Sequence, residues 1–245
     1  MRIRISSPPY HSGSGGIKVL HRLGYLATLL GHRVDMISAV LNPEWGAYHA
    51  PFEGEPDLSI IPEINPASTP GNVVRWVLYF PGALSGPAVY PDHELVVSFQ
   101  DEYLEAARLA APGRKVEEFF LAAVELPGIE DPVPRGPGSC YWQGKGPREI
   151  PPGGIEQEIT RGWPASRRDL VRLLKSCRTL YSCDQHTAVN QEGQLCGCDV
   201  FVWNGEHFAL WYDTFAYEFI AIEKVQLEET ARFLAICAEH FGVRA

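Results

Sequence analysis

The sequence predicts an α/β protein with two lobes, and three observations lead to this fold class. Apolar runs of strand length alternate with segments of helical periodicity, as in proteins built on a parallel sheet. A span rich in proline and glycine, residues 126–138, divides the chain, and the alternation is repeated after it. The lobes are therefore expected at residues 1–125 and 126–225, followed by a last helix within residues 226–245. In such sheets, ligands bind at loops that follow the carboxyl ends of the strands.

Composition narrows the class of protein. Apolar residues make up 45% of the 245 residues and charged residues 21%, which is ordinary for a folded protein with a sizeable core. The 21 basic and 30 acidic side chains give a net charge of −9, which disfavours broad attraction to nucleic acid or anionic lipid but leaves room for a local basic pocket. Neither a secretory leader nor an apolar run of membrane-spanning length is visible, so we expect a cytoplasmic protein without a membrane span.

The cysteines carry no metal-site signature. Six of them are scattered through a chain of enzyme size, which favours reduced thiols over a disulfide framework. Cys196 and Cys198 could form half of a zinc site, but no second pair lies at zinc-ligand spacing. We therefore expect small buried side chains here and no bound metal.

The first half begins with a strand, a glycine-rich loop and a helix. RIRIS at 2–6 alternates charged and apolar residues, the loop spans residues 8–16, and apolar positions then recur at helical spacing from Ile17 to Leu30. Gly31 stands where a helix C-cap is expected. The remaining elements expected in this half are strands at 34–40, 58–61 and 95–99, a short helix at 73–79 and a helical pattern at 103–109.

The second half repeats this order. Strands are expected at 140–142, 155–159, 179–182 and 200–203. Ser166 followed by Asp169 forms a capping box ahead of an apolar helical pattern. A second helix is expected to start after Asp184, and residues 226–241 form a last amphipathic helix.

Two glycine-rich loops suit the binding of phosphate. The glycines of GSGG at 13–16 permit close backbone approach to an anion at a helix N-terminus, although the loop matches neither the full dinucleotide fingerprint nor a Walker loop. Lys145 stands between Gly144 and Gly146 at the end of a strand, where it could clamp a diphosphate with Arg148 nearby. A connecting turn and a solvated lysine are the alternatives. Trp163 follows the next strand, where its ring could stack on a nucleobase or cover the sheet.

The densest group of polar residues lies between 181 and 203. A strand ends in Ser182, Asp184 is expected to cap the following helix, Thr187 lies in its first turn, and Glu192 follows Asp184 by eight positions. First-turn amides and a hydroxyl can bind phosphate, and a carboxylate on the same helix can accept both hydroxyls of a ribose. Helix capping together with an exposed glutamate is the alternative interpretation.

Three segments resemble GT-B glycosyltransferases of the short, bacterial or viral type. YSCDQHTAVNQEGQLCGCDVFVW resembles the family's donor-binding segment, and SGSGGIKVLHRLGYLATLLGHRVDM resembles its opening glycine loop, helix and following step. PEINPASTPGNVVRWVLYFPG is similar to a stretch that some members carry in their N-terminal lobe. Together they cover about 70 of the 245 residues in the family's order, in a chain shorter than most members.

The resemblance implies two Rossmann-like lobes with a nucleotide-sugar cleft between them, the first on the acceptor side and the second on the donor side. The last helix would pack back onto the first lobe. Gly15 and Gly16 would lie near the donor's phosphates, with Lys145 on the diphosphate, Thr187 on phosphate and Glu192 on the ribose. The spacing from Asp184 to Glu192 matches the family's EX7E pattern, with aspartate in the first position.

The expected reaction is metal-independent displacement at the anomeric carbon of a nucleotide sugar, which acts as a cosubstrate without any further cofactor. Amides at helix N-termini, Lys145 and Arg148 would offset the charge of the departing nucleoside diphosphate. Glu63 and Asp101 rank above His11 as the base for the acceptor hydroxyl, because each carboxylate follows a predicted strand. Helix capping is the alternative role for both carboxylates, and His11 has the better intrinsic pKa.

Other classes of function remain open. An epimerase of the same fold would use similar donor contacts, and a non-catalytic protein would bind the nucleotide or sugar without turnover. A phage-type enzyme that glycosylates modified DNA bases is also a glycosyltransferase, although the net charge of −9 disfavours it. The acceptor is thus a glycan, a small molecule or modified DNA.

Overall fold

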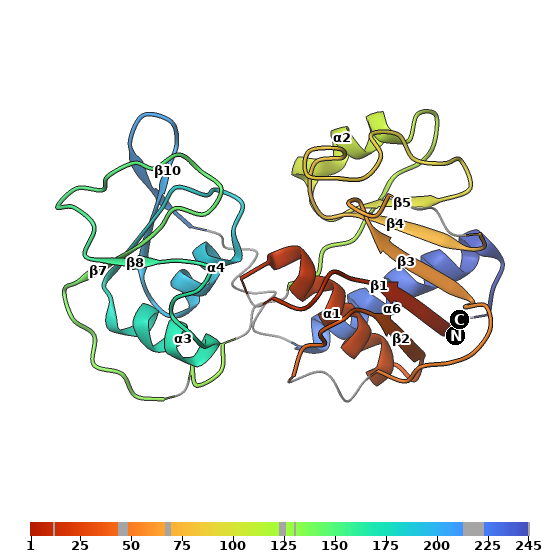
Figure 1. Cartoon of the computed structure of the whole chain (residues 1–245), viewed down its shortest axis with the longest axis horizontal. Helices are drawn as coiled ribbons and strands as arrows, with labels where there is room; N and C mark the ends of the chain where they lie inside the picture. The colour runs from red at the N-terminus through yellow and green to blue at the C-terminus, as the bar shows by residue number, and fades with distance from the viewer. Residues whose placement is uncertain are drawn as a thin grey trace. The chain divides into compact units, whose positions relative to one another are not determined.

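The structure, a computed structural model, describes residues 1–11, 13–43, 49–66, 70–122, 126–129, 131–212 and 223–244. The chain forms two compact units (Figure 1). Unit 1 comprises residues 1–122 and 222–245, and unit 2 comprises residues 123–221. The divisions expected from the sequence lie at 125/126 and 225/226. The C-terminal segment belongs to unit 1, so two crossings of the chain join the units.

Unit 1 is built on a six-stranded parallel sheet with the order β2-β1-β3-β4-β5-β6. The central strands are buried along their whole length, as expected for a parallel sheet covered on both faces. The strands are β1 (Arg2–Ser6), β2 (Arg33–Ile37), β3 (Leu58–Pro62), β4 (Val73–Val77), β5 (Leu95–Ser98) and β6 (Glu117–Glu118).

Helices cover both faces of this sheet. Helix α1 (Gly15–Leu29) packs against α6 (Glu223–Phe241), and Trp76 of β4 stacks on Phe233 of α6 at a centroid distance of 6.2 Å. Helix α2 (Asp101–Ala110) lies on the other face (Figure 1), where Val77 and Val96 form part of its core. The chain leaves α1 through Gly31, whose φ of +86° suits glycine.

The helix expected at 73–79 is wrong, because Val73–Val77 forms the buried strand β4. Its three valines and one tryptophan are residues that favour strands. The chain nevertheless has to return between consecutive parallel strands. Among the described residues of the two connections, 63–66 with 70–72 and 78–94, no helix makes this return, and irregular backbone crosses the face instead.

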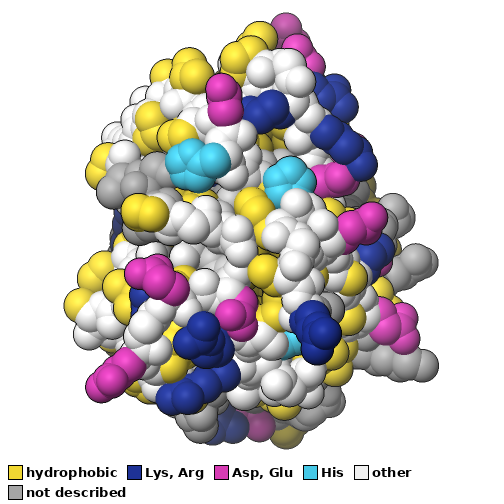
Figure 2. All heavy atoms as spheres, turned by 90° about the vertical axis from the view of Figure 1, so that its right-hand side faces the viewer, with side chains coloured by type: hydrophobic (Ala, Val, Ile, Leu, Met, Phe, Trp, Pro, Cys, Tyr) yellow, Lys and Arg dark blue, Asp and Glu magenta, His cyan; other side chains and the backbone are white. Residues whose placement is uncertain are grey.

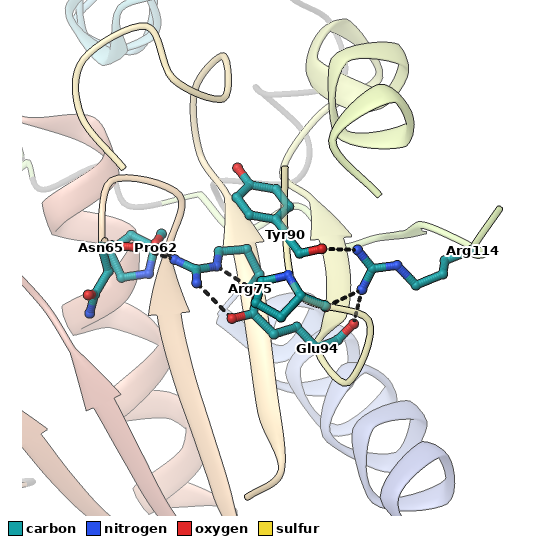
Figure 3. A network of polar contacts seen from close by, with 7 residues as sticks. Pro62, Asn65, Arg75, Tyr90, Glu94 and Arg114 are labelled. Atoms are coloured by element: carbon teal, nitrogen blue, oxygen red, sulfur yellow. Dashed lines mark hydrogen bonds and ion pairs between the residues drawn. The ribbon is translucent and has the colours of Figure 1, made fainter. Parts of the chain in front are cut away.

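Two arginines hold these connections on the face of the sheet (Figure 3). Arg75 of β4 donates two hydrogen bonds to the Glu94 carboxylate, at 2.7 and 2.9 Å, and two more to the carbonyl oxygens of Pro62 and Asn65. Arg114 donates to three carbonyl oxygens at the far end of the second connection, those of Tyr90, Pro91 and Glu94. The carbonyl groups of buried irregular backbone need hydrogen-bond donors of this kind, because they lack the amide donors that a helix supplies.

Unit 2 is built on a five-stranded sheet with the order β11-β10-β9-β7-β8, parallel except for the edge strand β11. Strands β6 and β11 are absent from the elements expected from sequence. The strands are β7 (Ser139–Trp142), β8 (Gln157–Ile159), β9 (Thr179–Ser182), β10 (Asp199–Trp203) and β11 (Phe208–Trp211).

The described helices of unit 2 pack against one core of the sheet. Helix α3 (Arg167–Ser176) contributes Leu170, Val171, Leu173 and Leu174. Helix α4 (Ala188–Leu195) contributes Val189 and approaches the strands so closely at Gly193 that a β-carbon there would meet Leu180. All six cysteines of the chain are free and buried. No helix in the described part of the chain is long and apolar enough to cross a membrane.

Candidate functional site

The carboxyl ends of β7 and β9 bring together two of the segments expected to bind the donor. These strands are neighbours, with Trp142 paired to Ser182. The loop after β7 carries the exposed Lys145, whose amide donates to the Asp184 carboxylate at 3.0 Å. The second oxygen of that carboxylate accepts from the His186 amide at 3.1 Å. Asp184 therefore ties the Lys145 loop to the turn before α4.

Glycine is required on both sides of Lys145. A β-carbon on Gly146 would overlap the carbonyl oxygen of Cys183, and one on Gly144 would overlap the Asp184 side chain. Gly144 also has a φ of +60°, a conformation that other residues rarely adopt. The glycines thus let two loop backbones touch, which fixes the base of the Lys145 side chain.

The turn between β9 and α4 is held by its own side chains. The Ser182 hydroxyl is buried, accepts from the Asp184 amide at 3.2 Å and donates to the Asp184 carbonyl at 3.1 Å. Asn190 of α4 donates to the same carbonyl at 2.9 Å. Thr187, not Asp184, is the N-cap of α4, since its hydroxyl accepts from the Val189 amide and the helix starts at Ala188. The expected helix start directly after Asp184 is wrong for that reason.

Glu192 lies inside unit 2 and not on an exposed helix face. Its side chain is fully buried and forms an ion pair with Arg167, the first residue of α3. The paired charges offset the cost of burying the carboxylate. A role for Glu192 at a ribose would therefore require the carboxylate to exchange or share Arg167 as a partner.

The two other donor candidates of unit 2 occupy exposed positions. Arg148 makes a bidentate pair with Glu158 of β8, at 2.7 and 2.8 Å, and its guanidinium lies over the Tyr141 ring. Trp163 follows β8 and is 46% exposed, which leaves its ring accessible instead of covering the sheet. The Thr160 amide donates to its carbonyl and closes the turn.

Unit 1 presents glycines at the start of α1. Gly15 and Gly16 are the first residues of the helix, and a β-carbon on Gly15 would meet nothing within 4 Å. Gly16 faces Leu78, 3.6 Å from the corresponding position. His11 lies just ahead, exposed, with its Nδ1 accepting from the Gly13 amide at 3.0 Å. The amides at the start of α1 are thus sterically approachable.

Glu63 directly follows β3, as expected, but it is buried. Its carboxylate accepts from the Leu78 amide, just beyond the end of β4, at 3.0 Å. The side chain therefore bridges the carboxyl ends of two neighbouring strands. A loop packs on the Glu63 backbone, because a β-carbon on Gly86 would overlap the Glu63 carbonyl oxygen.

Asp101 is paired with a carboxylate that sequence analysis missed. Asp101 is the first residue of α2, and Glu118 ends β6, where it is paired with Ser98 of β5. A hydrogen bond that protonated Glu118 donates to the Asp101 carboxylate raises the pKa of Glu118 above its usual value, so Glu118 keeps its proton to higher pH. No pattern in the surrounding sequence marked Glu118, because β6 has only two residues.

The geometry gives each unit its own chemical character at the carboxyl ends of its strands. Unit 2 offers a lysine, fixed loop amides and a capped helix start, which suit an anionic ligand. Unit 1 offers carboxylates, which suit a hydroxyl group or a proton transfer. Among the described residues, no group of three histidine, cysteine, aspartate or glutamate side chains could hold a metal ion.

Two α/β units with largely parallel sheets and loops of this kind define a GT-B-like fold. No family model matches the sequence, and no curated protein matches it either. The structure is similar to that of an alpha-glucosyltransferase solved in complex with UDP and a 13-mer DNA containing an HMU base. The match has a TM-score of 0.52 and 11% sequence identity, and it covers 98% of this chain and 95% of that chain. At this identity the match shows a shared fold.

Proposed function

We propose that this protein is a glycosyltransferase that moves a sugar from a nucleoside diphosphate sugar to a hydroxyl group. The observation that carries the proposal is the fold match, which extends over 98% of this chain and 95% of a glucosyltransferase bound to UDP. The carboxyl edge of unit 2 supports it, because Lys145 stands on a loop that Asp184 fixes in place.

The donor's diphosphate would lie against Lys145 and the amides at the start of α4. These positive groups would stabilise the leaving diphosphate as its charge develops. The phosphate role expected of Gly15, at the start of α1, is a separate prediction with its own test. In this proposal Glu63 or Asp101 takes the proton of the attacking hydroxyl, and no metal ion takes part. Transfer should therefore persist in the presence of EDTA.

The acceptor that the comparison favours is a hydroxymethylated pyrimidine in DNA, since the matched glucosyltransferase was solved with DNA containing an HMU base. The charge of −9 argues against broad attraction to DNA, and Figure 2 shows acidic side chains interspersed with basic ones on the face in view. Recognition would therefore depend on the modified base more than on the phosphate backbone. The affinity of the protein for the modified DNA should therefore fall only weakly as the salt concentration rises.

A transfer assay with labelled UDP-glucose tests the function. The acceptors are hydroxymethyluracil DNA, hydroxymethylcytosine DNA, the same sequence with thymine, and a panel of free sugars. We expect product with at least one hydroxymethylated DNA and none with thymine DNA. Product with a free sugar would support the transferase activity but show that the acceptor is a sugar and not DNA. Turnover of the donor to an isomer, or binding without turnover, would contradict the proposal.

Matched variants test the donor site. Lys145→Ala should weaken binding of UDP more than binding of uridine, because the lysine contacts phosphate. Gly15→Ala should leave folding intact, as its β-carbon meets nothing, while it hinders close approach of the diphosphate. Gly162→Ala is the control, because its β-carbon also points into open space and Gly162 has no proposed role. Isothermal titration calorimetry provides the affinities.

A further inference from the structure

Tyr90 lies in the interior of unit 1, between the sheet and α2. It is 2% exposed and packs with Val77, Val96 and Tyr103. The Arg75 guanidinium lies 5.0 Å from the centroid of the Tyr90 ring, and the Tyr90 amide donates to the Ala110 carbonyl at 2.8 Å. The ring and backbone are therefore held firmly.

The Tyr90 hydroxyl, by contrast, has no hydrogen-bond partner among the described residues. Figure 3 shows it at the end of the ring that points away from the Arg75–Glu94 pair, whereas the Tyr90 carbonyl faces Arg114. Burying a hydroxyl without a partner destabilises a fold, and phenylalanine would fill the same space without that cost. Packing alone thus does not account for a tyrosine at this position.

The surroundings of this hydroxyl belong to the carboxyl edge of the sheet. Val77 ends β4, Tyr103 lies in the first turn of α2, and Glu63 follows β3. Burial, and after it the negative charge of Glu63, raises the pKa of Tyr90, so the phenol stays a neutral donor. Val77 packs in the same cluster as Tyr90, and the next amide, that of Leu78, donates to the Glu63 carboxylate at 3.0 Å, so the Tyr90 ring and the carboxylate lie at the same end of β4.

A loop covers this region. The Ser85 hydroxyl donates to the Ile64 carbonyl at 3.2 Å, and Gly86 lies directly on Glu63 and Ile64. The start of the loop is anchored, because Tyr79 and Phe80 pack on Tyr103, but farther along Leu84 is 65% and Val89 61% exposed. Tyr90 and Glu63 are both buried, so a ligand can reach them only when the structure around them moves, and the exposed part of this loop is the segment that would move at low cost.

We propose that the Tyr90 hydroxyl and the Glu63 carboxylate form a binding site for the hydroxyl group of the acceptor, under the loop 79–89. Tyr90 donates a hydrogen bond to the acceptor oxygen, and the acceptor hydroxyl donates to Glu63. The inference rests on the proposed function for the identity of the acceptor, a hydroxymethylated base. It goes beyond that function by assigning the residue that recognises the hydroxyl.

The test compares two DNA duplexes that differ by one hydroxyl, hydroxymethyluracil against thymine at a single position. Binding is measured by fluorescence anisotropy in the absence of donor, so that the result does not depend on turnover. The wild-type protein should prefer the hydroxymethylated duplex by about ten-fold or more, because a site built to bond a hydroxyl leaves its own groups unpaired with the analogue. Tyr90→Phe should lose most of this preference.

Thermal unfolding of the same variant separates recognition from structure. Tyr90→Phe should melt at the wild-type temperature or slightly above it, because the hydroxyl has no partner to lose. Tyr25→Phe, a partly buried tyrosine of α1, is the control and should keep the preference for the hydroxymethylated duplex. A wild-type protein without preference, an undiminished preference in Tyr90→Phe, or a lowered melting temperature in Tyr90→Phe would each overturn the inference. Preference without sugar transfer would instead contradict only the proposed function.

Discussion

The two units fix the loops around their strand ends in different ways. In unit 1, a long charged side chain holds the loops, as Arg75 does with Pro62, Asn65 and Glu94. In unit 2, the two loops at the ends of β7 and β9 touch through backbone at Gly146, and Asp184 captures a neighbouring amide. The support in unit 1 thus depends on a charged side chain buried in the core, and the support in unit 2 depends on glycines, which have no side chain.

The difference has consequences for function. Unit 1 also has one close glycine contact, at Gly86, but Leu84 and Val89 on either side of it are largely exposed, whereas both neighbours of Lys145 make close contacts. The donor side of the proposed enzyme would thus be built in advance, while the acceptor side would open at residues 79–89. Variants that remove either kind of support should therefore differ in stability.

Breaking the buried pair of unit 1 should cost the most. Arg75→Met leaves the Glu94 carboxylate buried without its partner, which typically lowers the free energy of unfolding by about 3 to 5 kcal/mol. Chemical denaturation followed by circular dichroism measures this loss. The double variant with Glu94→Leu should recover part of it, because no unpaired charge remains.

The control for this prediction is an exposed pair in the same unit. Arg232→Met removes the partner of Glu229 on the surface of α6, and surface pairs contribute little. The change should stay within about 0.5 kcal/mol. An Arg75→Met variant no less stable than Arg232→Met would show that the connections of unit 1 are held by other contacts.

The glycine contact of unit 2 is expected to come next. Gly146→Ala forces a β-carbon into the carbonyl of Cys183, and overpacking of this severity lowers the free energy of unfolding by about 3 kcal/mol. Gly162→Ala, which meets nothing within 4 Å, should change it by less than about 0.5 kcal/mol. Equal stability of the two variants would mean that the loops do not need close contact.

The sequence allowed much of unit 2 to be predicted because its signals are local. Glycines on both sides of Lys145 indicated a tight turn, and the spacing of three positions from Ser166 to Asp169 indicated a capped helix. The structure confirms the cap, with the Asp169 amide donating to the Ser166 hydroxyl at 3.1 Å. The α/β fold class is confirmed as well. Thr187 in place of Asp184 as the N-cap is an error of one turn, since both residue types favour that position.

Unit 1 was predicted less well because the side chains that support it carry no local signal in the sequence. The expected alternation of strands and helices led to a helix at 73–79, although the valines of this segment favour a strand. Arg75 and Glu94 meet across 19 positions, and Glu118 meets Asp101 only because β6 adds to the edge of the sheet. Propensity and spacing contain no information about such pairs. The roles of the site residues remain predictions.

A third test uses pH, because His21 also holds a loop of unit 1. Its Nδ1 accepts from the Asn42 amide, and burial lowers the pKa of His21 to about 4. The unfolded chain binds a proton near pH 6.5 while the folded chain does not, so stability falls as the pH drops from about 6.5 towards 4. The loss from this group should reach about 2 to 3 kcal/mol, estimated from 1.36 kcal/mol per pKa unit.

Urea denaturation at a series of pH values measures this contribution. His21→Asn keeps an acceptor near the position of Nδ1 but does not titrate, so its stability should fall less steeply between pH 6.5 and 4 than that of the wild type. At pH 7.5 both proteins have a neutral side chain at this position, and their difference reports packing alone. Parallel curves for the two proteins would show that His21 is protonated in the folded state.

The smallest effect is expected at the local cap of unit 2. The Ser166 hydroxyl accepts from the Asp169 amide at 3.1 Å and also contacts the Asp169 carboxylate, on an exposed turn at the start of α3. Ser166→Ala should cost about 1 kcal/mol, the usual value for an N-cap. Ser166→Asp should retain most of the stability, because aspartate also caps well, although it places a second carboxylate beside Asp169. If the two loops of unit 2 are supported independently, the loss of stability in Ser166→Ala should add to that of Gly146→Ala when both changes are combined, since the two sites share no partner. A loss well above the sum would show that the cap of α3 and the Lys145 loop are coupled through the core, and that the contrast with unit 1 is one of degree.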